Sequence, residues 1–472
     1  MLFNSVEFLI FLPLVFVLYW FVANRNLRAQ NLLILLASYV FYGWWDWRFL
    51  GLIVLSTVVD FLVGIRIEEA PSIRRKKQWL WVSLAVNLGI LGYFKYANFF
   101  IENWIAAWGS LGVAMHASTL QIVLPVGISF YTFQTLSYSI DVYRGNLKAT
   151  RHWIDFGSFV SFFPQLVAGP IERASNLLPQ MAKPRSFSYE KGRDGMRLIL
   201  WGMFKKVVVA DSCAPFVDMC FSDPGAHSGG MLILGAVLFS FQIYGDFSGY
   251  SDIAIGTAKL FGFELMTNFK VPYFSRDIAE FWRRWHISLS TWFRDYMYIP
   301  LGGSRVSRPK ALRNVLVIFL VSGFWHGAQW TFLAWGGIHA MLFIPLFLRG
   351  TNRQHATDVV AEGHWLPSWK ELLQMAWTFS AVTVAWVFFR ADSMGDAMGY
   401  LGRWGFDVSG ELPFGILALL VFLCVADWLG SRGKNLLPEG RLADVAIQSI
   451  MLAMILLFRN QEGGVDFMYF QF

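Results

Sequence analysis

Long apolar stretches separated by short polar ones run through almost the whole chain. A helix needs about 20 mostly apolar residues to cross the hydrocarbon layer of a membrane, which is about 30 Å thick. The stretches at 153–170 and 195–220 contain Pro, Gly or Lys, and we expect them to be re-entrant or interfacial. The pattern therefore predicts an all-α, polytopic membrane protein with about 11 crossings. The candidate segments are 6–23, 31–46, 49–64, 79–95, 120–140, 153–170, 195–220, 231–248, 311–326, 330–348, 372–389, 413–430 and 443–458.

The composition agrees with a membrane environment. Of the 472 residues, 56% are hydrophobic and only 15% are charged, against about 25% charged in an ordinary soluble domain. The polar stretches at 171–194, 349–371 and 390–412 are too short to bury a core of their own. We therefore predict a single membrane domain that covers residues 1–472.

The net charge of +7 is concentrated in loops. Lys and Arg accumulate on the cytoplasmic side of membrane proteins, so these loops predict the orientation of the helices. The first segment, 6–23, is followed by no small-residue cleavage site, and we interpret it as an uncleaved span that begins outside the cytoplasm. This places the N-terminus outside the cytoplasm, and no nucleic-acid-binding module is visible. The basic loops are 24–30, 65–78, 144–152 and 304–314.

The chain has three cysteines, Cys213, Cys220 and Cys424. Their spacing matches neither a disulfide framework nor a zinc site. We interpret them as small core residues, and we expect no metal.

The segment 268–303 carries the first chemical signal. Ser275 is predicted to cap a helix along which aromatic residues recur at helical spacing. His286 follows Trp282 by four residues and so lies on the aromatic side, away from Arg283 and Arg284. One interpretation is an amphipathic helix at the membrane surface. The other is a re-entrant helix that lines a cavity, where the arginines meet an anionic donor such as the phosphates of a coenzyme.

The second signal is the segment Val321–Trp330. Gly323 and Gly327 form a GxxxG pair, which allows another backbone to come close. His326 lies beside this pair in an apolar span, where an ionisable residue usually faces the protein interior and has a function. A structural hydrogen bond to a neighbouring helix is the alternative. His339 is 13 residues further on and points to a different helix face, so we interpret it as structural.

A histidine suits one particular reaction. Transfer of an acyl group from a thioester to a sugar hydroxyl needs a base that takes the hydroxyl proton, and imidazole is the side chain best matched to neutral pH. General-base catalysis contributes roughly 10²–10⁴-fold. A thioester is already activated, so no metal is needed, and a dry channel would suppress its hydrolysis.

Three motifs together resemble the membrane-bound O-acyltransferase family. They are Phe281–Tyr296, Phe324–Gly327 and Phe162–Arg173, and the resemblance extends over nearly the whole chain. Within the family, the chain most resembles the bacterial branch that acetylates alginate or cellulose or transfers D-alanine to teichoic acid. The Pro164 and Gly169–Pro170 positions of the third motif are interpreted as structural helix breaks.

The resemblance implies a fold with helices around a central tunnel and an active-site histidine at His326. The second family histidine falls on His286. The donor, acetyl-CoA, would enter from the cytoplasmic face as a substrate, with no permanently bound cofactor. The acetyl group would pass to an exopolysaccharide or to a periplasmic partner protein that relays it.

Several polar and aromatic residues near the two histidines are candidates for substrate binding or for lining the tunnel. Asp246 is included because a buried Asp in a membrane span is rarely without a role. The candidates are Trp282, Arg283, Arg284, Trp285, Ser290, Arg294, Asp295, Tyr298, Trp325, Gly327 and Asp246.

Two other classes of protein fit part of the pattern. A transporter of acetyl groups or glycolipids would be expected to have two related halves with broken helices, and we find no internal repeat. A non-catalytic membrane scaffold of a polysaccharide secretion complex would not need His326. Substitution of His326 therefore distinguishes the scaffold from the enzyme.

Overall fold

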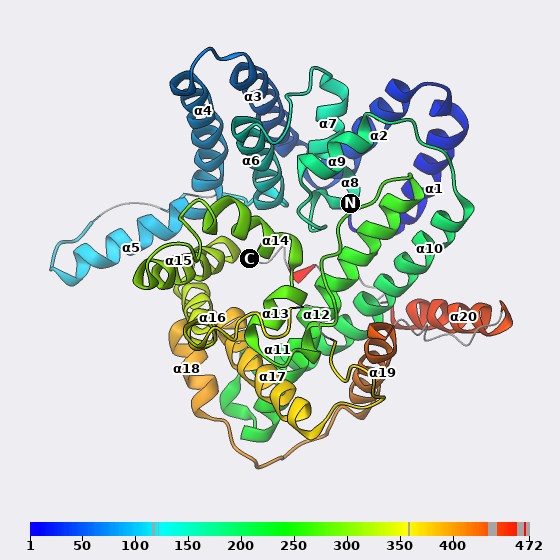
Figure 1. The fold of residues 1–472 in the computed structure, drawn as a ribbon. Coiled ribbons are helices and arrows are strands. Elements are labelled where there is room, and N and C mark those ends of the chain that lie inside the picture. Colours follow the sequence, from blue (N-terminus) through cyan, green and yellow to red (C-terminus); the bar gives the residue numbers. More distant parts are fainter. Residues whose placement is uncertain (116–118, 121, 357–358, 433–440, 460–466, 469–472) are drawn as a thin grey trace. The chain divides into compact units, whose positions relative to one another are not determined.

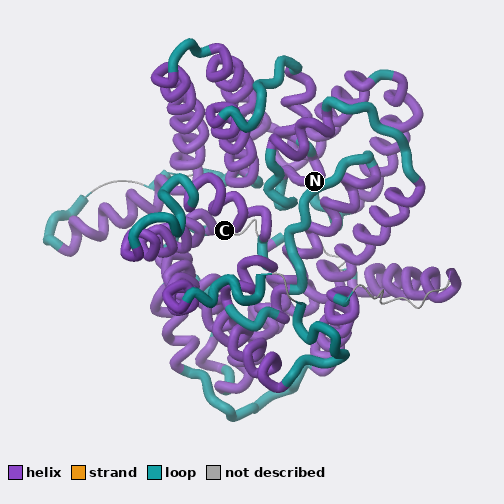
Figure 2. The backbone as a smooth tube through the Cα atoms, viewed as in Figure 1, coloured by secondary structure: helices purple, strands orange, loops and turns teal. Residues whose placement is uncertain are grey.

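A computed structural model describes the chain except for residues 116–118, 121, 357–358, 433–440, 460–466 and 469–472. Throughout the described residues the secondary structure is helical, as predicted (Figures 1 and 2). The chain forms two compact units, which we describe separately. Unit 1 consists of residues 1–196 and 254–266, and unit 2 of residues 197–253 and 267–472. The single domain predicted from composition stays a prediction.

Among the residues that the structure describes, seven segments are long and apolar enough to cross a membrane. They are Val6–Arg25, Leu27–Glu69, Ile73–Ser110, Gly229–Leu260, Trp330–Arg349, Trp369–Arg390 and Phe414–Ser431. The second has 43 residues, about twice the length of one crossing, and contains two 20-residue helices. A multi-pass membrane protein is therefore confirmed, and the predicted number of crossings stays a prediction.

Unit 1 contains the first nine helices and parts of two more, α10 and α12. A buried polar cluster joins α3, α4 and α6: Asp60 accepts hydrogen bonds from Asn87 at 2.7 Å and from Ser139 at 2.7 Å. A carboxyl group inside a membrane protein needs such partners. The bounds are α1 Val6–Val17, α2 Leu27–Asp46, α3 Leu50–Glu69, α4 Ile73–Leu91, α5 Ala97–Ser110, α6 Ile128–Arg144, α7 Trp153–Ser161, α8 Phe163–Leu166, α9 Ala174–Met181, α10 Tyr189–Met203 and α12 Gly229–Leu260.

Both segments predicted to be re-entrant or interfacial depart from a regular membrane helix. The stretch 153–170 breaks at Phe162, between α7 and α8. The stretch 195–220 contains a π-helical turn, Phe204–Ala210, between α10 and α11.

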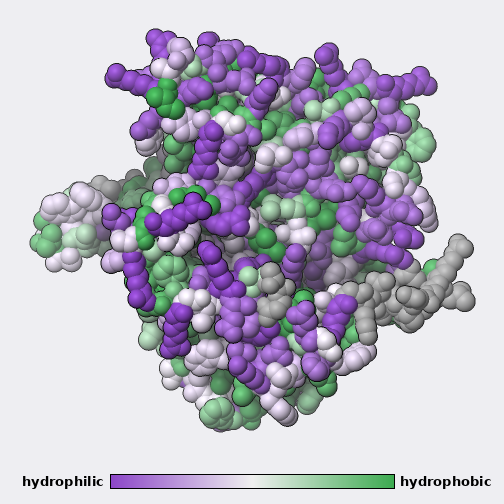
Figure 3. All heavy atoms as spheres, in the orientation of Figure 1, coloured by the Kyte–Doolittle hydropathy of each residue, from purple (hydrophilic) through white to green (hydrophobic). Residues whose placement is uncertain are grey.

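The loop between α3 and α4, before the basic run Arg74–Lys77, lies among hydrophilic side chains (Figure 3).

Unit 2 holds both His286 and His326, and its helices α15 and α16 pack closely together. Gly323 makes this approach possible, because a β-carbon there would collide with the carbonyl oxygen of Phe332. The GxxxG prediction is thus confirmed for Gly323, whereas Gly327 is covered by the ring of Phe332. The bounds are α11 Asp211–Ser222, α13 Ile278–Arg284, α14 Ile287–Phe293, α15 Arg308–His326, α16 Trp330–Arg349, α17 Trp369–Arg390, α18 Met394–Gly402, α19 Phe414–Ser431 and α20 Arg441–Phe458.

The cysteines agree largely with the prediction of core residues. Cys213 and Cys220 are buried, Cys424 is half-buried, and all three are free thiols.

Candidate active site

His286 lies at a break between two helices rather than inside one. The cap of α13 is Asp277, whose side chain accepts the N–H of Glu280 at 2.7 Å, so the prediction that Ser275 caps this helix is wrong. The Ser275 hydroxyl instead donates to the carbonyl of Pro272. Helix α13 ends at Arg284, and His286 adopts a left-handed backbone conformation with φ 43°. Such a conformation is uncommon outside glycine and often marks a functional position.

The segment before α13 holds this break in place. The N–H of Ile287 donates to the carbonyl of Asn268 at 2.9 Å, and the N–H of Lys270 donates to that of Arg284 at 2.9 Å. Each of the two helices flanking the break buries four of its seven residues within the protein. The break is what places the His286 side chain in the interior.

The His286 side chain is fully buried among aromatic rings, as predicted. The ring of Phe247 meets it edge-on, with centroids 4.7 Å apart. Its Nδ1 atom lies 3.1 Å from Oδ1 of Asn268. Burial lowers the pKa of His286 to about 3, because an apolar environment disfavours the charged imidazolium. His286 is therefore neutral at physiological pH.

His326 is the last residue of α15 and is also buried. Its ring packs against those of Trp325, Trp335 and Phe389, at centroid distances of 4.9, 5.1 and 5.4 Å. The ring of His286 lies 6.3 Å away. The structure thus brings the two sequence-predicted histidines into one site, while their catalytic roles stay predictions.

His339 lies closer to this site than its spacing suggested. The spacing argument assumed one continuous helix, but α15 ends at His326 and α16 begins at Trp330. Trp335 contacts both imidazoles, with its centroid 5.1 Å from His326 and 4.8 Å from His339. Trp282 also packs edge-on against His339 at 5.0 Å. Its surroundings are aromatic, and the structural role stays a prediction.

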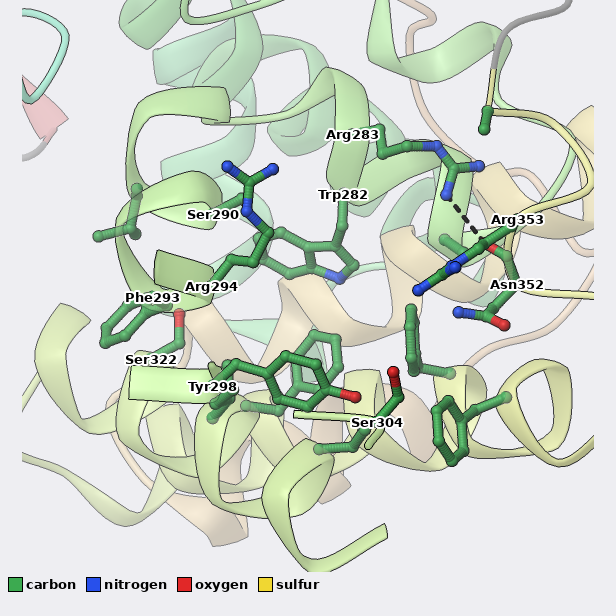
Figure 4. Close-up of a pocket in the computed structure, with 18 residues that line it drawn as sticks. Trp282, Arg283, Ser290, Phe293, Arg294, Tyr298, Ser304, Ser322, Asn352 and Arg353 are labelled. Atoms are coloured by element: carbon green, nitrogen blue, oxygen red, sulfur yellow. Dashed lines mark hydrogen bonds between the residues drawn. The ribbon is translucent and has the colours of Figure 1, made fainter. Parts of the chain in front are cut away.

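A cavity of about 440 Å³ is lined by residues that flank the two histidines in sequence on α13, α14 and α15, although neither histidine is part of its lining. Trp282 crosses its centre, with Arg283 and Arg353 on one side and Arg294 on the other (Figure 4). Ser322 also lines it, one helical turn before His326 on α15. The lining residues are Ala279, Trp282, Arg283, Leu289, Ser290, Phe293, Arg294, Tyr298, Ser304, Val315, Ile318, Phe319, Ser322, Phe343, Phe347, Asn352, Arg353 and Ala356. The cavity thus combines apolar walls with three arginines.

Arg283 also holds the loop that closes one side of this cavity. Its guanidinium donates to the carbonyl oxygens of Asn352 at 3.0 Å and His355 at 3.1 Å. The loop in turn contributes Asn352 and Arg353 to the lining. One arginine therefore both lines the cavity and shapes its wall.

Five of the predicted tunnel residues line this cavity: Trp282, Arg283, Ser290, Arg294 and Tyr298. The other six have different surroundings. Arg284 pairs with buried Glu280 at 2.7 Å, and Asp295 pairs with Arg294 at 2.6 Å. Trp285 packs in the core, 5.1 Å from the ring of Trp386, and the ring of Trp325 lies 6.3 Å from His286. Gly327 is covered by Phe332.

Asp246, the sixth, belongs to a buried ionic cluster. It pairs with Lys206 at 2.7 Å and accepts the N–H of Met468 at 3.0 Å. The neighbouring Lys205 pairs with Asp252 at 2.6 Å. Lys206 and Lys205 both come from the π-helical turn, which places their ammonium groups beside α12. The polar character of this part of α12 is therefore accounted for by ion pairs.

Sequence reasoning missed several residues of the site. Arg353, Asn352 and Ser304 lie in polar connections with no helical pattern, and no spacing singles out Asn268, the first residue of the segment 268–303. Ser322 could have been found, since it precedes His326 by one helical turn.

Comparison with known proteins places this site in a family. The profile of the membrane-bound O-acyltransferase family matches residues 147–359, which include both histidines. The chain is 45% identical over 398 residues to a probable alginate O-acetylase of Azotobacter vinelandii, covering 84% of this chain and 76% of that protein. It is 36% identical over 433 residues to a peptidoglycan O-acetyltransferase of Helicobacter pylori, covering 85% and 79%.

A more distant relative is a teichoic acid D-alanyltransferase of Bacillus subtilis, 27% identical over 282 residues, or 56% of this chain and 68% of that protein. The part of this chain that aligns with the two acetyltransferase relatives is longer than the profile match and continues on both sides of it. The chain therefore belongs to the membrane-bound O-acyltransferase family and is a multi-pass membrane acyltransferase.

Proposed function

We propose that this enzyme transfers the acetyl group of acetyl-CoA to a hydroxyl group of an exopolysaccharide, or to a periplasmic partner protein that passes it on. The observation that carries the proposal is the pair of buried histidines, 6.3 Å apart, beside a cavity lined by arginines. The printed names of the relatives, an alginate O-acetylase and a peptidoglycan O-acetyltransferase, support an acetyl donor and a polymeric acceptor.

The cavity suits a donor with an anionic end and a slender apolar arm. Its volume of about 440 Å³ falls within the range of about 300–1,000 Å³ that is usual for small-molecule sites. Guanidinium groups bind phosphates through charge-assisted hydrogen bonds, so Arg294 and Arg353 would hold the phosphates of coenzyme A. The apolar walls would receive the arm that ends in the thioester, near Ser322 and His326.

The reaction needs one base and no metal. The acceptor hydroxyl gives its proton to the imidazole of His326 while its oxygen bonds to the thioester carbonyl carbon. The carbon–sulfur bond then breaks, and the imidazolium returns the proton to the departing thiolate of coenzyme A. The buried aromatic walls exclude water, which would otherwise compete with the acceptor. His286 would assist as a proton relay or in donor binding.

The same proposal includes an orientation. Basic residues such as Arg74–Lys77, in the first turns of α4, favour the cytoplasmic side. This places the N-terminus in the periplasm and the protein in a bacterial inner membrane. The acceptor would then meet the site from the periplasmic side, and the donor from the cytoplasm.

The direct test is acetyl transfer from radiolabelled acetyl-CoA by the purified protein in detergent, supplied with acetylatable glycan or with its co-purified partners. The His326→Ala variant is compared with His364→Ala, a change at an exposed histidine outside the cavity. We expect His326→Ala to lose transfer and His364→Ala to retain it. More than a tenth of the wild-type product in His326→Ala would overturn the role of His326. A scaffold would support polymer modification equally well with either variant.

A further inference from the structure

Asn268 contacts His286 through its side chain and the next residue, Ile287, through its backbone carbonyl, and it is fully buried. Its Oδ1 atom lies 3.1 Å from Nδ1 of His286, 2.9 Å from the Ser288 hydroxyl and 3.3 Å from the Ser288 backbone nitrogen. On the other side of the amide, Nδ2 donates to the hydroxyl of Ser251 at 3.0 Å. Both polar atoms of the Asn268 side chain, Oδ1 and Nδ2, therefore have hydrogen-bond partners within unit 2.

These contacts fix which way the amide is turned. A backbone N–H can only donate, so the Asn268 atom that faces Ser288 must be the carbonyl oxygen. A second neighbour of His286 Nδ1 is the Ser288 hydroxyl at 3.4 Å, which donates its hydrogen to Asn268 Oδ1 at 2.9 Å instead. A carbonyl oxygen can only accept, so the contact of Nδ1 with Asn268 Oδ1 assigns the proton of the imidazole to Nδ1. A neutral imidazole holds one proton, which leaves Nε2 as the basic nitrogen. The network therefore selects one of the two tautomers.

The backbone of Asn268 fixes the ring in space as well. Its carbonyl accepts the N–H of Ile287, the residue directly after the left-handed His286. A strained conformation persists only where its surroundings hold it. One residue thus constrains both the backbone that carries the imidazole and the nitrogen that holds its proton.

We propose that Asn268 is the positioning residue of His286, anchored by Ser251, and that it keeps Nε2 of His286 as the nitrogen that exchanges protons during acyl transfer. This inference rests on the proposed function of the site. Asn268 touches neither the cavity nor His326 in the contacts described above, so it acts through His286 alone.

The first test needs no activity. In protein labelled with ¹⁵N at histidine, the two imidazole nitrogens of a neutral ring differ according to which carries the proton, and His286→Gln identifies the His286 signals. We expect the wild type to show His286 with its proton on Nδ1. The opposite tautomer would overturn the inference whether or not the protein transfers acetyl groups.

The second test separates positioning from a merely structural role. Asn268→Ala should lower kcat for acetyl transfer by about tenfold to a hundredfold, with the KM for acetyl-CoA changed by less than about twofold. Asn268→Asp places a carboxylate beside the imidazole, which favours the imidazolium, so the acid limb of the pH–rate profile should move upward by about 1–3 pH units. Retention of the wild-type pH profile in Asn268→Asp would overturn the proposal.

Asn314→Ala is the matched control. Asn314 is a fully buried asparagine of the same unit, and its amide donates to the backbone carbonyls of Leu301 and Gly303. We expect its loss to lower thermal stability without moving the pH profile or the tautomer of His286. If wild-type protein shows the expected tautomer but transfers no acetyl group, the proposed function fails and the positioning of His286 stands.

Discussion

The imidazole rings of His286 and His326 lie 6.3 Å apart, and each is held in a different way. His286 projects from a break between α13 and α14, where Asn268 contacts it, whereas His326 ends α15 between Trp325 and Trp335. Both rings are buried in unit 2, so the two imidazoles are close neighbours in one interior. The arrangement suggests that the two residues act on the same proton.

This relationship predicts non-additive losses of activity. We expect His286→Ala to reduce acetyl transfer by roughly 10²–10⁴-fold, the usual contribution of a positioned acid or base. Residues that act as one unit lose most of their effect when either is removed. The double variant with His326→Ala should therefore be no slower than His326→Ala alone. Rate losses that multiply in the double variant would show that the two histidines act independently.

Substitution of Arg294, which lines the cavity, should give a different defect from substitution of Arg284, which does not line it. Arg294 lines the cavity and is partly exposed, so Arg294→Ala should raise the KM for acetyl-CoA severalfold, since an exposed ion pair is worth up to about 1 kcal/mol. Arg284 pairs with the buried carboxylate of Glu280 instead. Arg284→Ala should lower the melting temperature and leave this KM unchanged.

The comparison is made by steady-state kinetics at low and high salt. The difference in KM between wild type and Arg294→Ala should shrink as salt screens the interaction. An equal rise in KM for Arg284→Ala would mean that both arginines contact the donor.

Helical periodicity predicted much of this site, whereas the residues placed by irregular backbone could not be predicted from the sequence. The aromatic side of the segment around Trp282 and the GxxxG position Gly323 followed from spacing alone. The left-handed turn at His286 could not, because no glycine marks it. That turn ends the periodicity on which the placement of Arg284 and Asp295 depended. The pairing of Asp246 with Lys206 likewise depends on a π-helical turn that no local pattern announces.

Ser322 provides a test of the route that the acetyl group takes. It lines the cavity one turn before His326, and it is nearly buried. Under direct transfer its hydroxyl is not a nucleophile, so Ser322→Ala should retain most acetyl transfer. Ser322→Leu should fill this part of the cavity, raise the KM for acetyl-CoA and lower kcat. Complete loss of transfer in Ser322→Ala would indicate an acyl-serine intermediate instead.

The buried, neutral state of His286 predicts how stability depends on pH. An unfolded histidine binds its proton below pH 6.5, whereas folded His286 does so only near pH 3. Between these values the unfolded state binds more protons, so the free energy of unfolding must fall as pH falls through this window. We expect the melting temperature in detergent to be lower at pH 5 than at pH 7.

The contribution of His286 is isolated by replacing it with a side chain that does not titrate. In His286→Phe the aromatic packing against Phe247 is largely kept, but the proton linkage is gone. The drop in melting temperature between pH 7 and pH 5 should therefore be smaller in His286→Phe than in wild type. His364→Ala, at an exposed histidine, should show the full wild-type drop, because His286 is intact in this variant. An identical drop in wild type and His286→Phe would mean that folded His286 takes up its proton at the same pH as the unfolded chain.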